Sequence, residues 1–594
     1  MPGMNSGLSP SDPTLVAAFR SALLHQGAIA LLMLVFLWLL WATARTWRPA
    51  VSAGTSGVTA GEPAEARARW LLRTGFGVLW IFDGILQAQP KMAGGLATQV
   101  MEPIAASSPG WVQHLVNWGG TAWSYHPIQA GAASVWIQVG IGTWLIVAVR
   151  GPWSRLAGAA SVIWGLIVWV FGESFGGIFA PGLSWLTGAP GAVLIYVVAG
   201  ALIALPGGAW RTPRPGRLLL AGLGVFFAAM AVLQAWPGRG FWPGRAAAKP
   251  GTLSRMVTEM AGTPQPHFLS SLLSGFASFA TRYGFAVNLV VVIALAAMGA
   301  AFLSGRPRLV RYAMWSGIVF CLADWVLVQD FGFLGGLGTD PNSMIPLIVL
   351  FSAGYLALTP AAQEAETPAR ATEAKRPRAR SVAAAGALAV ILLGAAPMAA
   401  AAVNRTADPI LALAISGDST SLNLPAPGFS LTDQNGRTVS LAGLRGKVVL
   451  MTFLDPVCTS DCPIIAQEFK QTGQMLGAQA KNVELVAVVA NPTYRSTAFT
   501  RAFDRQEGLA TVPDWLYLTG SLSQLGAVWR HYGVTVANLP AGAMAAHNDL
   551  AVVIDPAGRI RQELSSDPGP ATSSTRSSFS VLLGQYARQA LRQS

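Results

Sequence analysis

The first four hundred residues alternate between long apolar runs and short polar segments. A helix needs roughly 17 to 25 mostly apolar residues to cross a hydrocarbon core of about 30 Å. Ten runs approach or reach that length, and we expect each to form a membrane-spanning helix. They cover residues 27–43, 75–89, 128–149, 156–172, 189–205, 218–236, 283–304, 312–328, 343–359 and 382–403.

From about residue 424 the pattern changes to short β-branched runs that alternate with amphipathic stretches, which is typical of an α/β sheet. Hairpins are expected at 429–441 and 549–561, strands at 447–454, 483–490 and 515–518, and helices at 462–478, 496–507, 521–532 and 575–592. This order predicts a thioredoxin-like fold. The expected fold class is therefore a multi-span α-helical membrane domain followed by an α/β thioredoxin-like domain.

Composition agrees with a membrane protein. Only 11% of the residues are charged and 52% are hydrophobic, with a mean hydropathy of +0.46. A soluble globular domain carries about 25% charged residues, so an ordinary cytosolic enzyme is not expected. The basic excess lies in residues 1–403, which hold 25 Lys and Arg against 13 Asp and Glu, whereas residues 404–594 hold 15 against 14. A nucleic-acid partner is not expected, because its binding surface would need basic residues gathered on one soluble face.

The distribution of Lys and Arg between the expected spans predicts an orientation, because positive residues are retained on the cytoplasmic side. Alternate connecting segments carry 18 and 7 of these residues. We therefore expect a multi-pass protein of the cell membrane, in contact with the lipid bilayer. Both termini and the C-terminal domain are expected on the extracytoplasmic face.

Two stretches of the membrane region read as copies of one four-span unit. The motif L-Q-A-Q-P at 86–90 recurs as L-Q-A-W-P at 233–237. An even number of spans makes the copies parallel. The expected organisation is an N-terminal span and basic cytoplasmic loop (1–69), two four-span repeats (70–206 and 217–360), a charged linker (361–381), a final span (382–403), a second linker (404–423) and the thioredoxin-like domain (424–594).

Asp83 and Asp324 are the carboxylates expected in the middle of spans. A charge there costs a few kcal/mol, roughly 2.5 to 3.5 on insertion scales, so a functional or paired site is one interpretation. The other is a neutral Asp hydrogen-bonded to a neighbouring Trp or Ser. The segment R-W-L-L-R-T-G-F-G-V-L-W-I-F-D-G at 69–84 resembles the DoxX-like membrane family. That resemblance implies an association with quinone or thiol redox chemistry.

Two of the three cysteines form a close pair where the strand at 447–454 gives way to a helix. The segment is D-P-V-C-T-S-D-C-P, with Cys458 and Cys462. A helix N-terminus stabilises a thiolate, so we expect a lowered pKa for Cys462. The spacing suits either a redox-active disulfide or one bound ion. Soft thiolates favour Cu(I), and an added imidazole allows Cu(II) as well; His547 is the candidate third ligand and Met544 a weak further donor.

These residues resemble the Sco/SenC family. The resemblance rests on C-x-x-x-C-P at 458–463 after the strand, and on His547 ahead of the I-D-P-x-G-R pattern at 554–559. It implies a thioredoxin fold on the outer face of an energy-transducing membrane, with Cys458, Cys462 and His547 binding copper for the binuclear copper centre of cytochrome oxidase. Some members of that family instead reduce the thiols of that site. This chain departs from the family pattern at Thr459, where Pro is usual, and at 491–497, where an acidic stretch is replaced.

Three functions remain open at this point. The first is a membrane-anchored copper-delivering protein. The second is an enzyme, a thiol-disulfide oxidoreductase supplied with electrons from quinone through the membrane region. A self-contained relay of that kind needs a cysteine pair in the membrane, and that region holds only Cys321, so a separate protein would have to supply the electrons. The third is a transporter with a redox-sensing cap; a peroxidase is disfavoured because C-x-x-x-C-P is not the usual peroxiredoxin arrangement.

Overall fold

The structure is a computed structural model that describes residues 13–46, 65–180, 184–242, 251–263, 265–334, 336–358, 376–403, 419–459, 461–538, 544–565 and 578–593. The chain divides into two compact units. One unit comprises Leu24–Gln89 and Ala132–Ala396, and is helical. The other comprises Met1–Leu23, Pro90–Gly131 and Pro397–Ser594, and contains the α/β domain.

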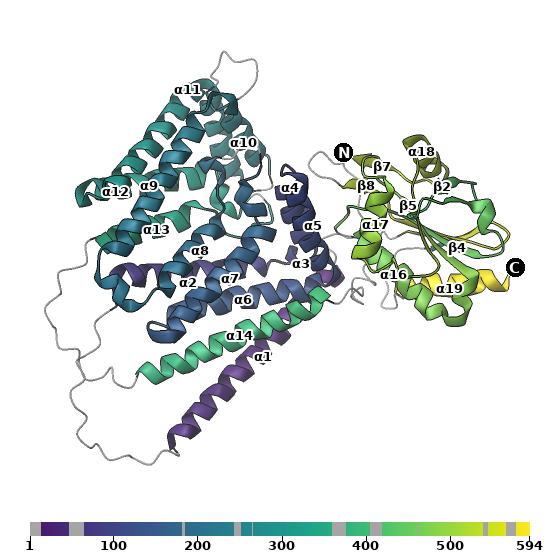
Figure 1. The fold of residues 1–594 in the computed structure, drawn as a ribbon, viewed down its shortest axis with the longest axis horizontal. Helices are drawn as coiled ribbons and strands as arrows, with labels where there is room; N and C mark the ends of the chain where they lie inside the picture. The colour runs from purple at the N-terminus through teal and green to yellow at the C-terminus, as the bar shows by residue number, and fades with distance from the viewer. Residues whose placement is uncertain are drawn as a thin grey trace. The chain divides into compact units, whose positions relative to one another are not determined.

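The N-terminal four hundred residues are helical wherever they form regular structure in the described ranges (Figure 1). The longer helices are α1 (Pro13–Thr46), α2 (Arg67–Gln87), α5 (Gly110–Tyr125), α6 (Pro127–Val147), α7 (Gly151–Phe171), α8 (Ala192–Ala204), α9 (Arg214–Ala235), α10 (Thr252–Ala261), α11 (His267–Ser304), α12 (Pro307–Leu327), α13 (Met344–Leu358) and α14 (Arg376–Val403). The short helices α3 (Met92–Gly95) and α4 (Glu102–Ala105) precede α5.

Seven helices among the described residues are long and apolar enough to cross a membrane. They lie in α1, α6, α7, α9, α11, α12 and α14. The N-terminal region thus has the make-up of a multi-pass membrane protein, with fewer full-length spans than the ten expected. Of the other three, α8 and α13 are apolar but have only 13 and 15 residues, and α2 carries Arg67, Arg69 and Arg73 in its first two turns.

Backbone conformation explains the late start of two of these helices. The spans expected at 189–205 and 343–359 begin at Ala192 and Met344. Gly191, just before α8, has φ +102°, and Asn342, two residues before α13, has φ +59°. A helix cannot include residues in the left-handed region, so each helix begins after them.

The segment 237–282, which connects two of the expected spans, is largely helical in its described part. It contains α10 and the first 16 residues of α11, which runs for 38 residues from His267. The reason lies in the spacing of apolar residues: Leu269, Leu273, Ala277 and Ala280 are buried at intervals of three and four. That interval places them on one face of a helix, although the polar residues between them break the continuous apolar run.

The C-terminal domain is built on a six-stranded sheet of order β1-β10-β9-β4-β5-β6. Its strands are β1 (Ser419–Pro425), β4 (Val448–Leu454), β5 (Val483–Val489), β6 (Trp515–Leu518), β9 (Leu550–Ile554) and β10 (Arg559–Ser565). Strands β4, β5 and β6 are parallel, and β9 runs antiparallel to β4. All seven residues of β4 and of β5 are buried, as expected for central strands covered on both faces.

Helices cover the sheet and two small hairpins flank it. Helices α16 (Asp461–Leu476) and α19 (Phe579–Arg592) pack against each other and against the central strands (Figure 1). The remaining elements are α17 (Thr497–Gln506), α18 (Leu522–His531), the hairpin β2 (Ser430–Thr432) with β3 (Thr438–Ser440), and the hairpin β7 (Val536–Asn538) with β8 (Ala545–His547). This mixed α/β arrangement confirms the fold class expected for the domain.

Elements expected from sequence in this domain agree closely with the structure, but three strands were not expected. They are β1, β7 and β8. Both expected linkers lie partly outside the described residues, at 361–375 and 404–418. The described remainder of each is ordered, since Arg376 begins α14 and Ser419 begins β1.

Candidate metal centre

The two cysteines lie in the turn that joins β4 to α16. Cys458 is in the turn, and Cys462 is the second residue of α16, followed by Pro463 in the first helical turn, where a missing N–H costs nothing. The exposed fraction is 7% for Cys458 and zero for Cys462, and both are reduced thiols. The turn therefore presents a reduced, almost fully buried dithiol.

Both sulfurs lie within reach of one ion. The Cys458 thiol donates a hydrogen bond to Asp461 Oδ1 over 3.2 Å. The donor atoms of Cys458, Asp461 and Cys462 all lie within 4.8 Å of one another. This proximity fits either coordination of a soft metal ion or oxidation to a disulfide.

His547 comes from a later segment of the chain and lies beside the cysteine pair. Its Nε2 lies 3.4 Å from Cys462 Sγ. Strand β9 runs antiparallel to β4, so its beginning lies beside the end of β4, and the Thr452 hydroxyl donates to the Leu550 carbonyl over 3.0 Å. The position of His547 just before the hairpin expected at 549–561 predicts a loop there, but in the structure His547 ends strand β8, which pairs with β7.

The environment of His547 favours a neutral ring whose lone pair faces the sulfur. Burial lowers its pKa, against the opposing effect of the Asp461 charge. Its Nδ1 lies 3.4 Å from the Asn548 carbonyl and 3.5 Å from Asp549 Oδ1. Two oxygen acceptors at Nδ1 favour the tautomer protonated there, which leaves Nε2 free to bind a metal.

The expected lowering of the Cys462 thiol pKa is wrong. Burial raises that pKa well above its usual value, and the neighbouring Cys458, Asp461 and Asp549 raise it further. The helix N-terminus does favour a thiolate, but removal from water and nearby negative groups outweigh it. The Asp455 N–H still donates to Cys462 Sγ over 3.4 Å. Without a cation the thiol keeps its proton, and a bound cation must displace it.

Hydrogen bonds of Asp455 and Asn491 hold the cysteine turn in place. They stand at corresponding places, Asp455 directly after β4 in L-D-P and Asn491 soon after β5 in A-N-P. Asn491 Nδ2 lies 3.0 Å from both carboxylate oxygens of Asp455, and the N–H groups of Val457 and Ala545 also donate to that carboxylate. Burial raises the pKa of Asp455 to about 7 in spite of these hydrogen bonds.

Sequence reasoning found Cys458, Cys462 and His547 but missed Asp455, Asp461 and Asn491. The signal for Asp455 and Asn491 was present, because carboxyl ends of adjacent parallel strands meet at one edge of a sheet, where α/β proteins bind ligands. The segment 491–497 was noted only for the acidic groups it lacks. Its Asn491 instead holds the turn in place.

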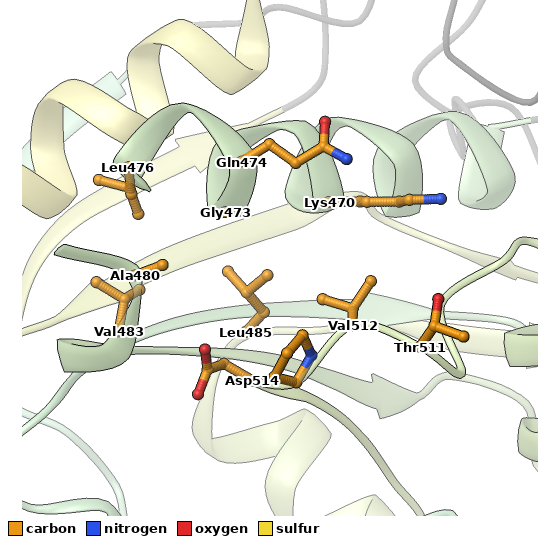
Figure 2. Close-up of a pocket in the computed structure, with 11 residues that line it drawn as sticks. Lys470, Gly473, Gln474, Leu476, Ala480, Val483, Leu485, Thr511, Val512 and Asp514 are labelled. Atoms are coloured by element: carbon orange, nitrogen blue, oxygen red, sulfur yellow. The ribbon is translucent and has the colours of Figure 1, made fainter. Parts of the chain in front are cut away.

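Figure 2 shows a separate hollow of about 310 Å³ between α16, β5 and the segment before β6. Its lining residues include Lys470, Leu485, Val512 and Asp514. None of the site residues expected from sequence lines it. The hollow therefore plays no part in the metal centre.

The two membrane carboxylates are buried within the helical unit. Asp83 in α2 is 2% exposed and Asp324 in α12 is 5% exposed. Neither carboxylate accepts a hydrogen bond of normal geometry, although the Tyr196 hydroxyl lies close enough to Asp83 to interact. Cys321 is fully buried in α12 as a free thiol. The partner expected for a neutral Asp, a Trp or Ser, is not present at either carboxylate in the described residues.

The fold and the site define a class: a thioredoxin-like domain with a buried dithiol at a strand-to-helix turn and a histidine against one sulfur. Residues 418–576 match the SCO1/SenC protein family, so the C-terminal part of the chain is a SCO1/SenC domain. This match does not extend to the membrane region, whose DoxX-like resemblance stays a prediction.

Several solved structures resemble this domain. Copper-bound ScoI of Bradyrhizobium japonicum is 20% identical, covers 28% of this chain and 98% of its own, and has a TM-score of 0.23. Copper-bound yeast Sco1 is 20% identical, and the match covers 24% of this chain and 80% of Sco1, with a TM-score of 0.22. BsSco is a member of the Sco family of cytochrome c oxidase assembly proteins and has a disulfide switch. It is 19% identical, and the match covers 30% of this chain and 98% of BsSco, with a TM-score of 0.24. No curated protein matches the chain.

Proposed function

We propose that this chain is a membrane-anchored copper-binding protein that carries copper on its C-terminal domain. Cys458, Cys462 and His547 are the ligands, and the receiver is an extracytoplasmic acceptor such as the copper centre of cytochrome oxidase. The observation that carries the proposal is the position of His547 Nε2, 3.4 Å from Cys462 Sγ, in a domain that matches SCO1/SenC.

The donor set suits copper in both oxidation states. Two thiolates favour Cu(I), and the neutral imidazole makes Cu(II) acceptable too. A hard dication such as Mg²⁺ would need oxygen ligands in octahedral geometry. The sulfurs of Cys458 and Cys462 do not meet that requirement. Support for the histidine by Asn548 and Asp549 is the outer-sphere arrangement that orients metal-binding imidazoles.

Redox state controls loading in this proposal. The reduced pair can bind Cu(I) through both sulfurs, with the two thiol protons released to solvent. Oxidation to a Cys458–Cys462 disulfide removes two electrons and two protons from the pair and leaves no thiolate to bind a metal. The reduced thiols of the structure correspond to the loading-competent state.

The test is copper binding by the detergent-solubilised full chain, reduced and oxidised. A Cys321→Ser background removes the third thiol, which is buried in α12. We expect stoichiometric binding in the reduced protein, none after oxidation, and weakened binding in His547→Ala. His531→Ala is the matched control, because His531 is exposed at the end of α18. Full copper affinity in a Cys458→Ser variant would contradict the proposal.

A thiol-disulfide oxidoreductase is the second candidate, favoured by the proximity of the two thiols. Cys458 is the more exposed sulfur and would attack a partner disulfide; Cys462 would then resolve the mixed disulfide, leaving two partner thiols and a Cys458–Cys462 disulfide. Rapid exchange with a model disulfide, together with no copper binding, would favour this function over the first.

For the membrane region we propose two parallel four-span repeats, an extracytoplasmic C-terminal domain and a function for Asp83 and Asp324. A recurring contact supports the duplication. Trp169 Nε1 donates to the Pro190 carbonyl and Trp325 Nε1 donates to the Pro341 carbonyl, each over 2.8 Å. Quinone as a ligand of this region stays a prediction from the DoxX-like resemblance.

A further inference from the structure

Met544 is a soft donor held against the cysteine turn. The Thr459 N–H donates to its Sδ over 3.3 Å, and the Thr459 hydroxyl lies 3.9 Å from the same sulfur. Thr459 follows Cys458 directly in the chain. The thioether therefore contacts the residue that directly follows Cys458, and it lies on the segment that leads to His547.

The backbone beside Met544 is fixed to the same support as the cysteines. The N–H of the next residue, Ala545, donates to Asp455 Oδ2 over 2.7 Å. Asp455 is fully buried and its own N–H donates to Cys462 Sγ. One buried carboxylate thus connects the methionine segment with the dithiol, which pre-organises the thioether at the site.

Charge favours a thioether over a further carboxylate as an extra ligand for Cu(I). Two thiolates and one Cu(I) already carry a net negative charge. The Asp461 carboxylate lies within 4.8 Å of both sulfurs, and Asp549 Oδ1 lies 3.5 Å from His547 Nδ1. A neutral sulfur adds a bond without adding charge. Soft donors are also those that Cu(I) selects.

The present partner of the sulfur does not prevent coordination. A thioether is a weak hydrogen-bond acceptor with lone pairs to spare, so a copper ion can engage Met544 Sδ at small cost. An apolar role alone would be filled equally well by Leu, whose volume is similar. If Met544 only packs, Met544→Leu should leave copper affinity unchanged, whereas if its sulfur binds copper, the same substitution should weaken binding.

We propose that Met544 Sδ is a fourth ligand of Cu(I), beside Cys458, Cys462 and His547. This inference rests on the proposed copper-binding function. It assigns the methionine to selection of the reduced ion, because a thioether adds affinity for Cu(I) and little for the harder Cu(II).

The decisive experiment is X-ray absorption at the copper edge on the reduced full chain, labelled with selenomethionine and loaded with Cu(I). We expect scattering from selenium in the copper shell, and its loss in Met544→Leu. Competition with a chromophoric Cu(I) chelator should show affinity reduced roughly 10-fold in Met544→Leu, at the low end of effects seen for residues that tune a metal site. Met475→Leu is the control, since Met475 is 38% exposed on α16.

The outcomes separate the two proposals. If the reduced chain binds no copper, the proposed function fails. If copper binds and no copper–selenium scattering appears, Met544 is not a ligand and this inference is overturned, whatever the stability of the variant. Scattering that persists in Met544→Leu would assign the signal to another of the 15 methionines and would equally overturn it.

Discussion

The side-chain amide of Asn491 holds the buried carboxylate of Asp455, with Nδ2 3.0 Å from each of its oxygens. The contact joins the carboxyl ends of β4 and β5. Since Asp455 also receives the N–H of Ala545, this pair connects the cysteine turn with the segment that carries His547. Asn491 thus acts on the candidate metal centre through Asp455, whose N–H donates to Cys462 Sγ.

We expect Asn491→Ala to loosen the site and destabilise the domain. Loss of one partner of a buried polar group costs about 1 to 3 kcal/mol. Hydrogen–deuterium exchange should quicken at the ends of β4 and β5, and copper affinity should fall. Asn482→Ala, at an exposed position directly before β5, is the control, expected to change stability by less than about 0.5 kcal/mol. Unchanged exchange in Asn491→Ala would show that Asp455 needs no such partner.

Asp461→Asn should make the dithiol more reactive. Asp461 accepts the Cys458 thiol hydrogen bond, and its charge is one cause of the raised Cys462 pKa. Removal of that charge lowers the pKa, although burial remains the larger cause. Alkylation of each cysteine, followed against pH by mass spectrometry, should shift to lower pH. Glu563→Gln, on an exposed position of β10, should leave the profile unchanged; the same profile in both variants would refute the assignment.

Stability of the domain should fall as pH rises, because buried carboxyl groups, Glu507 and Asp504 among them, prefer the protonated form. Burial raises the pKa of Glu507 from 4.5 to about 8 and that of Asp504 from 3.8 to about 7. Neither oxygen of Glu507 accepts a hydrogen bond. Above the unfolded-state pKa the unfolded chain has lost these protons while the folded chain keeps them, so stability is greatest at low pH within this window.

The slope for one such group is about 1.4 kcal/mol per pH unit between its unfolded and folded pKa values. In Glu507→Gln the decline in unfolding free energy between pH 5 and 8 should be shallower by up to that amount per unit. Chemical denaturation at several pH values, read on the C-terminal domain, measures it. A slope equal to that of the wild type would mean that Glu507 is ionised in the folded protein.

Asp83→Asn and Asp324→Asn should impair function without loss of folded protein. Each replaces a buried carboxyl group by an amide of the same shape, so packing is retained. The measurement is maturation of the copper acceptor in cells, together with the amount of folded protein in the membrane. Normal maturation in both variants would reduce these residues to structural ones.

The central strands were predictable because burial on both faces leaves a continuous apolar run, as in V-V-L-M-T-F-L of β4. Strand β1 was not, since six of its seven residues are exposed and its sequence S-T-S-L-N-L-P has no apolar periodicity. It is a strand because it pairs with β10, and pairing between distant segments leaves no local signal.

The cysteine pair and His547 were predictable from residue type and spacing, but the acidity of Cys462 was not. The position of a thiol at a helix N-terminus can be read from sequence, whereas its depth below the surface cannot. Here Cys462 is fully buried, and that depth determines the direction of its pKa shift. Asp461 lies next to it in the chain, yet only the fold directs its carboxylate toward Cys458.

The unequal exposure of the two sulfurs also affects how fast a bound metal ion could be released. Cys462 has no exposed surface, while Cys458 retains 7%, so of the two sulfurs an incoming ligand can reach Cys458 first. Release to bulk water would require two buried bonds to break with nothing to replace them. Handover should therefore be associative: its rate should rise with acceptor concentration through an intermediate in which both proteins share the ion, and dilution alone should strip the metal very slowly.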